Sequence, residues 1–338
     1  MTSKERLFAR LAGLTVDRVP NLNIVMMFAA RHAKVPYGKF CRDYRALVAA
    51  QTKTAIDFGI DILSTMSDPY REVHDYGAPI RFQEDNLPVC EKLLIQSPDD
   101  LPNLKNFDPK ADGGRIANNV HAIETLKSEN GDEFAVLGWV EGPWAEFTDL
   151  ASVEEGMMMQ FDEPEFVQEA MELITDKAIE CAIAQIEAGA DIIGVGDAAA
   201  SLVNADAYSE WILPLEKKIF QAIHSHGAKV KFHVCGNINH LLPHMVNSGA
   251  DIIDADYMVD YEEALRLAEG KCSISGNLDP VGLIMQGTPE MIREKTISLA
   301  KHPGKTSIIS SGCEIPRDTP PENVMAIHEA LKSCAGGC

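Results

Sequence analysis

One short sequence occurs twice and constrains the fold more than any other feature. "GADIIGVGD" at 189–197 and "GADIIDADY" at 249–257 are near-copies, and "FGIDILSTM" at 58–66 is a weaker third copy. Each has a glycine suited to ending a helix and continues into an apolar, β-branched run typical of a buried strand. A helix is predicted over 162–189, where apolar residues recur at spacings of three and four. Apolar strands that alternate with helices predict a parallel sheet covered on both faces.

Eight apolar runs of this kind can be counted, which is the number that a closed (β/α)8 barrel needs. They span 21–27, 61–66, 134–140, 191–196, 230–235, 251–256, 272–277 and 306–312. A length of 338 residues is normal for such a barrel folded as one unit. We therefore predict an α/β fold, a single TIM barrel over 1–338, with a helical lead-in at 1–20 and a frayed tail at 332–338.

The stretch 67–133, between the second and third predicted strands, is irregular. It predicts an inserted hairpin with loops rather than a second domain, because the chain has no linker rich in glycine, serine or proline. Two later helix starts are marked by sequence. Thr288 and Pro289 are typical of an N-cap and a first helical position, and the run from Thr319 to Glu322 is typical of a capping box.

The formal net charge of −21 argues against binding to nucleic acid or to anionic membranes. No secretory signal is visible at the start, and no run approaches the roughly 18 apolar residues of a membrane-spanning helix. We therefore expect a cytoplasmic protein. In that reducing compartment the eight cysteines would be packed residues, metal ligands or nucleophiles rather than a disulfide framework.

Polar and sulfur-bearing side chains follow the predicted strands at the carboxyl end, where barrels of this kind hold their active sites. In chain order they are Glu141, Asp197, Ser201, His233, Cys235, Asp254, Asp256, Asn277, Asp279 and Cys313. Taken singly, each has an ordinary structural explanation: the aspartates could cap helices and the cysteines could pack in the core. Their common position at one end of the strands favours a functional site.

The run "KVKFHVCG" at 229–236 carries the clearest chemistry. Side chains two apart on a strand point to the same face, so His233 and Cys235 would project together. Cys313 follows the last predicted strand, 78 residues later, and a barrel would bring it to the same mouth. One histidine and two cysteines would hold Zn²⁺ with a fourth position open, as in catalytic zinc sites. Asp256 could fill that position weakly.

Three segments resemble the uroporphyrinogen decarboxylase superfamily, and within it the corrinoid-dependent methyltransferases that include methylcobamide:coenzyme M methyltransferases. They are "HVCGNINHLLPHMVNSGADIIDADYMVD", "SISGNLDPVGLI" and "SSGCEIPRDTPPENVMAI". The resemblance is strong over about 134–331, and "DPYREVHDYGAPI" at 68–80 extends it toward the N-terminus. In that branch a His-x-Cys pair and a distant cysteine bind zinc, which implies His233, Cys235 and Cys313 here.

The resemblance implies methyl transfer between a corrinoid, such as methylcobalamin, carried on a separate corrinoid-binding protein, and a small substrate. The first choice of substrate is a thiol such as coenzyme M, activated as a zinc thiolate. Glu141, Asp197 and Asp256 are then the candidate catalytic residues. Ser201, Asn277 and Asp279 are the candidate cofactor-binding residues.

Other activities remain open. Demethylation of a methoxylated or methylated donor onto Co(I) corrinoid would use the same metal ligands, and a corrinoid-binding barrel without catalysis is a further alternative. Uroporphyrinogen decarboxylase itself is disfavoured. The arginine-rich signature that grips substrate propionates is replaced here by "NIVMMFAARHAKVPYGKF", in which Arg31 is the sole arginine. A tetracarboxylate would also be repelled by a chain of net charge −21.

Overall fold

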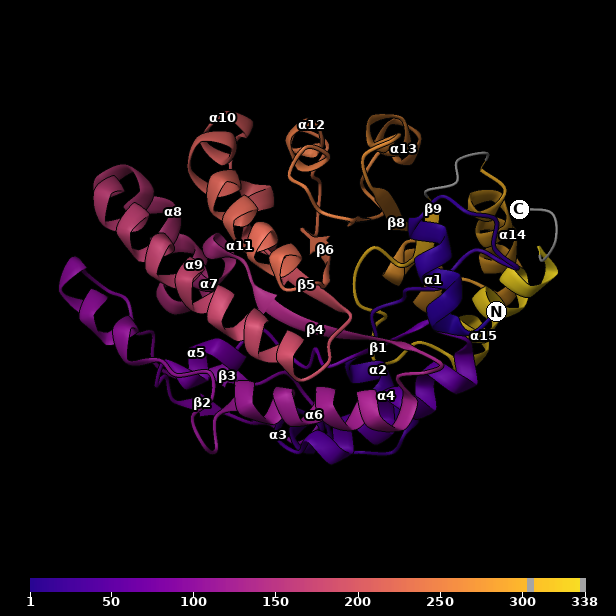
Figure 1. The fold of residues 1–338 in the computed structure, drawn as a ribbon, viewed down its shortest axis with the longest axis horizontal. Coiled ribbons are helices and arrows are strands. Elements are labelled where there is room, and N and C mark those ends of the chain that lie inside the picture. The colour runs from indigo at the N-terminus through magenta and orange to yellow at the C-terminus, as the bar shows by residue number, and fades with distance from the viewer. Residues whose placement is uncertain (303–306, 335–338) are drawn as a thin grey trace.

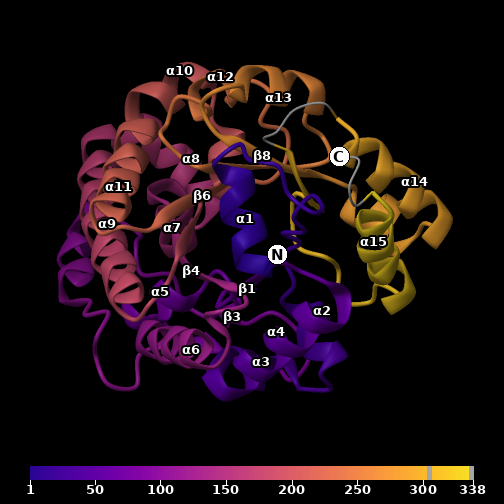
Figure 2. The ribbon, with the colours of Figure 1, turned by 45° about the vertical axis from the view of Figure 1, so that its right-hand side comes forward.

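Seven strands form one parallel sheet in the computed structural model, which describes residues 1–302 and 307–334. Their order in the sheet is β1-β4-β5-β6-β7-β8-β9, which is also their order along the chain. The strands are β1 (Ile62–Ser64), β4 (Ala135–Glu141), β5 (Ile192–Gly196), β6 (Lys229–His233), β7 (Ile252–Ala255), β8 (Ser273–Asn277) and β9 (Ser307–Ser310). The sheet curls, and helices surround it (Figures 1 and 2). The predicted α/β class with a parallel sheet is confirmed.

The segment predicted as the first strand, 21–27, is not a regular strand. It makes two isolated bridges, Asn21 with Ile309 and Ile24 with Glu314. A side chain accepts from one of its backbone amides: the amide of Asn21 donates to Asp61 Oδ2 at 2.7 Å. This hydrogen bond interrupts a regular ladder. The segment still spans the two edges of the sheet. The amide of Leu22 donates to the carbonyl of Ile309 in β9, and the amide of Asp61, directly before β1, donates to the carbonyl of Asn21, both at 2.8 Å.

The helices cover the outside of the sheet, as Figure 2 shows, and α1 lies across the amino ends of the strands. Lys4 of α1 forms an ion pair of 2.9 Å with Asp191, directly before β5. The α-helices are α1 (Ser3–Leu11), α2 (Met27–His32), α3 (Tyr37–Arg42), α4 (Tyr44–Phe58), α5 (Arg71–Asp75), α6 (Arg115–Asn130), α7 (Pro143–Ala151), α8 (Val153–Asp162), α9 (Pro164–Glu187), α10 (Ala205–Ala207), α11 (Leu213–Ser225), α12 (Leu242–Met245), α13 (Tyr261–Ala268), α14 (Pro289–Ala300) and α15 (Pro321–Ser333). The 3₁₀-helices are η1 (Pro98–Asn106) and η2 (Ala198–Leu202), and the π-helical segments are η3 (Tyr208–Ile212) and η4 (Pro280–Met285). Within the described residues, no helix combines the length and the apolar character needed to span a bilayer.

One of the two predicted helix starts is correct. Thr288 caps α14 and accepts a hydrogen bond from the amide of Met291. The capping box at Thr319 is wrong, because Pro320 is the N-cap of α15 and no side chain caps that helix. Thr319 lies one residue too early, and its buried hydroxyl finds no hydrogen-bond partner in residues 1–302 and 307–334.

The irregular stretch 67–133 contains α5, two short strands, η1 and α6. The two strands, β2 (Ile80–Arg81) and β3 (Val89–Cys90), pair antiparallel, with Ile80 opposite Cys90. At the other end of the chain, α15 extends into the predicted frayed tail as far as Ser333, and residues 335–338 lie outside the described residues.

Inside the curled sheet, the ring of Trp139 on β4 determines which residue fits at position 194 of the neighbouring strand β5. A Cβ atom on Gly194 of β5 would lie 2.2 Å from the ring of Trp139 of β4, so only glycine fits at that position. The space left by Gly194 lets the Trp139 ring approach His233 of β6, with ring centroids 5.8 Å apart. The carboxyl ends of β4, β5 and β6 are thereby packed closely around His233.

Candidate metal centre

The structure brings together the three residues that the sequence predicts as metal ligands. His233 is the last residue of β6, Cys235 follows two residues later, and Cys313 lies in the loop after β9. The thiol of Cys313 interacts with both His233 and Cys235, so the three side chains are neighbours. His233 is buried and the two cysteines are half-buried, so the group lies just inside the surface.

The imidazole of His233 is held in a fixed orientation by a neighbouring strand. His233 pairs in register with Asp254 of β7, and its Nδ1 lies 2.9 Å from Asp254 Oδ2. Nε2 is therefore the ring nitrogen left for Cys313 or for a metal ion. Asp254 also forms an ion pair with Lys231, and both of these side chains are 1% exposed. A carboxylate on the far nitrogen of a histidine is the usual partner of a metal-binding imidazole.

These contacts shift the acid–base properties of the group. Burial lowers the pKa of His233, but the hydrogen bonds with Asp254 and Cys313 outweigh it and raise the pKa to about 9. The hydrogen bond from Cys313 lowers the pKa of Cys235, whereas the same bond, together with burial, raises the pKa of Cys313. Of the two sulfurs, Cys235 therefore ionises more readily.

Across residues 1–302 and 307–334, no group of three or more His, Cys, Asp and Glu side chains is already arranged to hold a metal ion. The fit to a metal depends instead on the donors themselves. One imidazole with a fixed tautomer and two thiols form a set that suits Zn²⁺. Within the part of the chain that the structure describes, the buried Oδ1 of Asp254 has no hydrogen-bond partner, so that carboxylate keeps a further acceptor beside the ring.

Asp256 lies beside this group and is anchored by the backbone. Its Oδ2 accepts from the amide of Gly236 at 2.7 Å, and its Oδ1 accepts from the amide of Tyr257 at 2.6 Å. The Cα of Asp256 also lies 2.7 Å from where a Cβ on Gly312 would be. The loops after β6, β7 and β9 therefore meet at Asp256.

Glu141, at the end of β4, reaches the same mouth. Its Oε1 accepts from Arg71 Nη2 at 2.7 Å and from Trp139 Nε1 at 3.1 Å. Its Oε2 lies 2.9 Å from where a Cβ on Gly196 would be, and Gly196 pairs in register with His233. Burial raises the pKa of Glu141 to about 8, although Arg71 acts to lower it. This carboxyl group can therefore hold or release a proton near neutral pH.

The remaining predicted site residues are engaged in local structure. Both oxygens of Asp197 face amides at the start of α7, with Oδ1 2.6 Å from the amide of Ala145, and burial raises its pKa to about 7. Ser201 donates to the carbonyl of Ala198 at 3.0 Å. Asp279 caps η4 through the amides of Val281 and Gly282. Catalytic or cofactor-binding roles for these residues stay predictions.

Sequence reasoning missed three residues that support the site: Lys231, Arg71 and Glu72. Lys231 could have been found, because the alternation of β6 places it on the same face as His233, and a lysine in an apolar strand needs a buried acid. Arg71 is fully buried on α5 and lies 3.6 Å from Glu72 as well as contacting Glu141. Nothing local in the sequence marks the ion pair between Arg71 and Glu141, because it joins α5 to β4.

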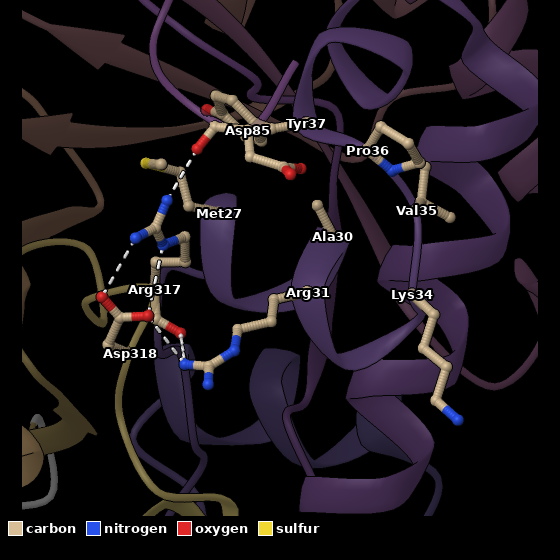
Figure 3. Close-up of a pocket in the computed structure, with 10 residues that line it drawn as sticks. All are labelled: Met27, Ala30, Arg31, Lys34, Val35, Pro36, Tyr37, Asp85, Arg317 and Asp318. Atoms are coloured by element: carbon tan, nitrogen blue, oxygen red, sulfur yellow. Dashed lines mark hydrogen bonds and ion pairs between the residues drawn. The ribbon is translucent and has the colours of Figure 1, made fainter.

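A separate cavity of about 510 Å³ lies between α2 and the loop after β9 (Figure 3). Figure 3 shows Arg31 and Arg317 both directed at Asp318, and Arg31 lies 2.8 Å from its Oδ1. None of the three candidate metal ligands lines this cavity. Its two arginines are therefore occupied by a shared carboxylate, outside the candidate metal centre.

The sequence matches the uroporphyrinogen decarboxylase (URO-D) family over residues 2–334. It is 28% identical over 340 residues to the methylcobamide:CoM methyltransferase MtbA of Methanosarcina mazei, with 98% of each chain covered. It is also 27% identical over 290 residues to the uroporphyrinogen decarboxylase of Gloeobacter violaceus, with 82% of this chain and 80% of that protein covered.

Two solved structures show the same kind of fold. A methyltransferase from Methanosarcina mazei superimposes with a TM-score of 0.88 over 98% of this chain and 99% of that one, at 21% identity. A B12-independent methionine synthase from Shewanella sp. W3-18-1 gives a TM-score of 0.58 over 86% of this chain and 87% of the other, at 14% identity.

Proposed function

The chain belongs to the uroporphyrinogen decarboxylase family, and from this premise we propose that it is a zinc-dependent, corrinoid-dependent methyltransferase. It moves a methyl group between a corrinoid, carried on a separate protein, and a small substrate. A thiol such as coenzyme M is the first choice of substrate, because the methyltransferase MtbA, whose printed name includes CoM, is similar over nearly the whole chain.

One observation carries the proposal. Cys313, from the far end of the chain, lies within reach of His233 and Cys235, and Asp254 fixes the tautomer of that histidine. Three donors of this kind, with the imidazole oriented by a carboxylate, fit Zn²⁺ and leave a fourth position for substrate. When bound, Zn²⁺ lowers the pKa of a coordinated thiol and so supplies a sulfur nucleophile at neutral pH.

Glu141 is the residue that we assign to proton transfer. Arg71 and Trp139 hold its Oε1, so Oε2 is the oxygen directed toward the mouth beside His233. As the S–H bond of an incoming thiol breaks, Oε2 of the ionised carboxylate takes the proton and becomes O–H. With a pKa of about 8, the carboxyl group can carry this proton and return it to solvent.

Asp256 and Asp197 act mainly by position. Asp256 ties Gly236 to the loop after β7 and so holds Cys235 at the mouth. Asp197 fixes the start of α7, which follows Glu141 directly. The same residues serve transfer in either direction, including demethylation of a methylated donor onto Co(I) corrinoid.

Uroporphyrinogen decarboxylase is the second candidate, because proteins of that name are also similar to this chain. A tetracarboxylate substrate needs several cations that are not already paired. Near the mouth, Arg71 is bound by Glu141, Arg115 is bound by Asp68, and Arg31 is bound by Asp318. Release of CO₂ from uroporphyrinogen by the purified protein would support this candidate over methyl transfer.

The test uses two half-buried cysteines, Cys313 and Cys90. Wild-type protein should contain about one zinc per chain and transfer methyl from methylcobalamin to coenzyme M. Cys313→Ser should lower both zinc affinity and rate by more than about 100-fold, because loss of a direct ligand costs more than loss of a supporting hydrogen bond. Cys90→Ser, on β3, should change neither property.

Metal analysis and the absorbance change of the corrinoid on demethylation measure the two effects. If Cys313→Ser keeps full zinc and full activity, the ligand assignment is wrong. If the wild-type protein binds zinc but transfers no methyl group to or from a corrinoid, the proposed activity is wrong.

A further inference from the structure

A recess of about 510 Å³ lies at the carboxyl end of β8, where Asn277 lines it. It is bounded by the loop after β7 and by η4 and α14. Its apolar lining consists of Tyr257, Leu283 and Met291. Tyr257 is 47% exposed and Met291 is 51% exposed, which is unusual for large apolar side chains bordering one recess.

The polar lining has an unsatisfied acceptor. Asn277 is the last residue of β8 and is only 8% exposed. Its Nδ2 donates to the carbonyl of Val259 at 3.0 Å, whereas its buried Oδ1 has no hydrogen-bond partner among the described residues. A buried amide oxygen of this kind favours a ligand that brings an N–H or O–H donor.

The charges in the recess disfavour an anionic ligand. Asp279 and Glu294 both line it, against one cation, Lys295. Oδ1 of Asp279 is already bound by the amides of Val281 and Gly282, so this carboxylate is fixed in place. A neutral ligand with an apolar body and amide groups at its edge matches these surroundings, because an amide both donates and accepts.

The recess is connected to the candidate metal centre through one residue. Tyr257 follows Asp256, and Asp256 accepts from the amide of Gly236, next to Cys235. A wide ligand seated in the recess would therefore extend across the loop at Asp256 toward the thiols. A methylated corrinoid is such a ligand: its ring is broad, and its periphery carries neutral carboxamides.

We propose that this recess seats the amide-bearing edge of the corrinoid, with a peripheral carboxamide donating to Oδ1 of Asn277 and the ring edge packed on Tyr257 and Met291. The proposal rests on the proposed function, since it names the site of the corrinoid that the reaction requires. It assigns corrinoid contacts to Tyr257 and Met291, which no catalytic argument includes.

The test measures binding of methylcobalamin to the purified full-length chain by absorbance titration. Met291→Glu should weaken binding at least about tenfold, because a carboxylate would be buried against the ring. Met158→Glu is the matched control: Met158, on α8, is also 51% exposed but lies outside the recess, and its variant should bind within about twofold of wild type.

A second probe isolates the hydrogen bond and does not depend on the folding of Met291→Glu. A methylcorrinoid with a carboxylate in place of the contacted carboxamide should bind wild type at least about tenfold more weakly than methylcobalamin. Asn277→Leu should bind methylcobalamin more weakly than wild type and should no longer distinguish the two corrinoids. Thermal unfolding confirms that each variant is folded.

The outcomes separate this proposal from the proposed function. Equal binding by wild type, Met291→Glu and Met158→Glu overturns the recess assignment, even if methyl transfer proceeds. Equal discrimination between the two corrinoids by wild type and Asn277→Leu overturns the Asn277 contact. Weaker binding by Met291→Glu alone supports the recess, even if no acceptor is ever methylated. No binding of methylcobalamin by wild type overturns both.

Discussion

Asp254 has two partners, the buried Lys231 and the candidate ligand His233, and the two roles can be tested separately. Asp254→Asn should weaken zinc binding by roughly 10–100-fold, because the amide no longer fixes and polarises the imidazole. It should also destabilise the fold by about 3–5 kcal/mol, because it leaves Lys231 charged and unpaired in the interior.

A double variant distinguishes the two effects. Lys231→Met combined with Asp254→Asn removes the unpaired charge, so chemical denaturation should show most of the stability restored, while zinc titration should still show weak binding. If Asp254→Asn binds zinc like wild type, the hydrogen bond to His233 does not prepare the metal site.

At the residue scale, the sequence predicts the position of a side chain where that position depends only on nearby residues. A spacing of two residues on a strand is enough to place His233 and Cys235 on one face. The position of Cys313 after the last strand is enough to place it at the mouth. The partnership of His233 with Asp254 depends on the register between β6 and β7. Register is a tertiary property, so the sequence alone also allows Asp254 to be a helix cap.

At the scale of elements, α7 carries two acids on the side of α5: Glu146 is buried and Asp149 is half-buried. Asp149 of α7 has its pKa raised to about 8, by burial and by Glu72, although Arg71 opposes the shift. An unfolded aspartate titrates near pH 3.9. Between roughly pH 4 and pH 8 the folded chain therefore holds a proton that the unfolded chain has lost, and this group destabilises the fold progressively as pH rises.

Asp149→Asn keeps the shape of the protonated form and cannot ionise. Its melting temperature should equal that of wild type near pH 4 and exceed it increasingly up to about pH 8. The matched variant Asp162→Asn, at the exposed end of α8, should show no such trend. A difference in melting temperature that is constant from pH 4 to pH 8 would contradict the shifted pKa.

Elements were predicted well where hydrophobic periodicity decides them, as for α9 and the strands from β4 to β9. They were predicted poorly where side chains compete with the backbone. At 21–27, Asp61 and Asn21 take the amides that a ladder would use, and α2 begins at Met27. At 319–322, two consecutive prolines shift the helix start by one residue, and the expected threonine cap is lost.

At the scale of the whole molecule, the alternation of strands and helices predicts the curled parallel sheet, and the sheet determines where the loops meet. The complete eight-stranded barrel remains a prediction, because the described sheet has seven regular strands. What the sequence could not supply is the pairing of charges across the interior, such as Arg71 with Glu141. Such pairs join segments tens of residues apart and leave no periodic pattern.

The size of the core leads to a last prediction, about metal removal. The apolar residues of the sheet and helices form one buried cluster that runs from Leu7 to Cys334. A chain of this length buries enough apolar surface to fold without a metal, unlike small zinc domains. Chelation should therefore abolish methyl transfer and leave the far-ultraviolet circular dichroism at 25 °C unchanged, and added Zn²⁺ should restore activity without refolding. Loss of helical signal on chelation would instead show that His233, Cys235 and Cys313 form a structural site. The helices would be lost with the metal only if the metal holds the fold together.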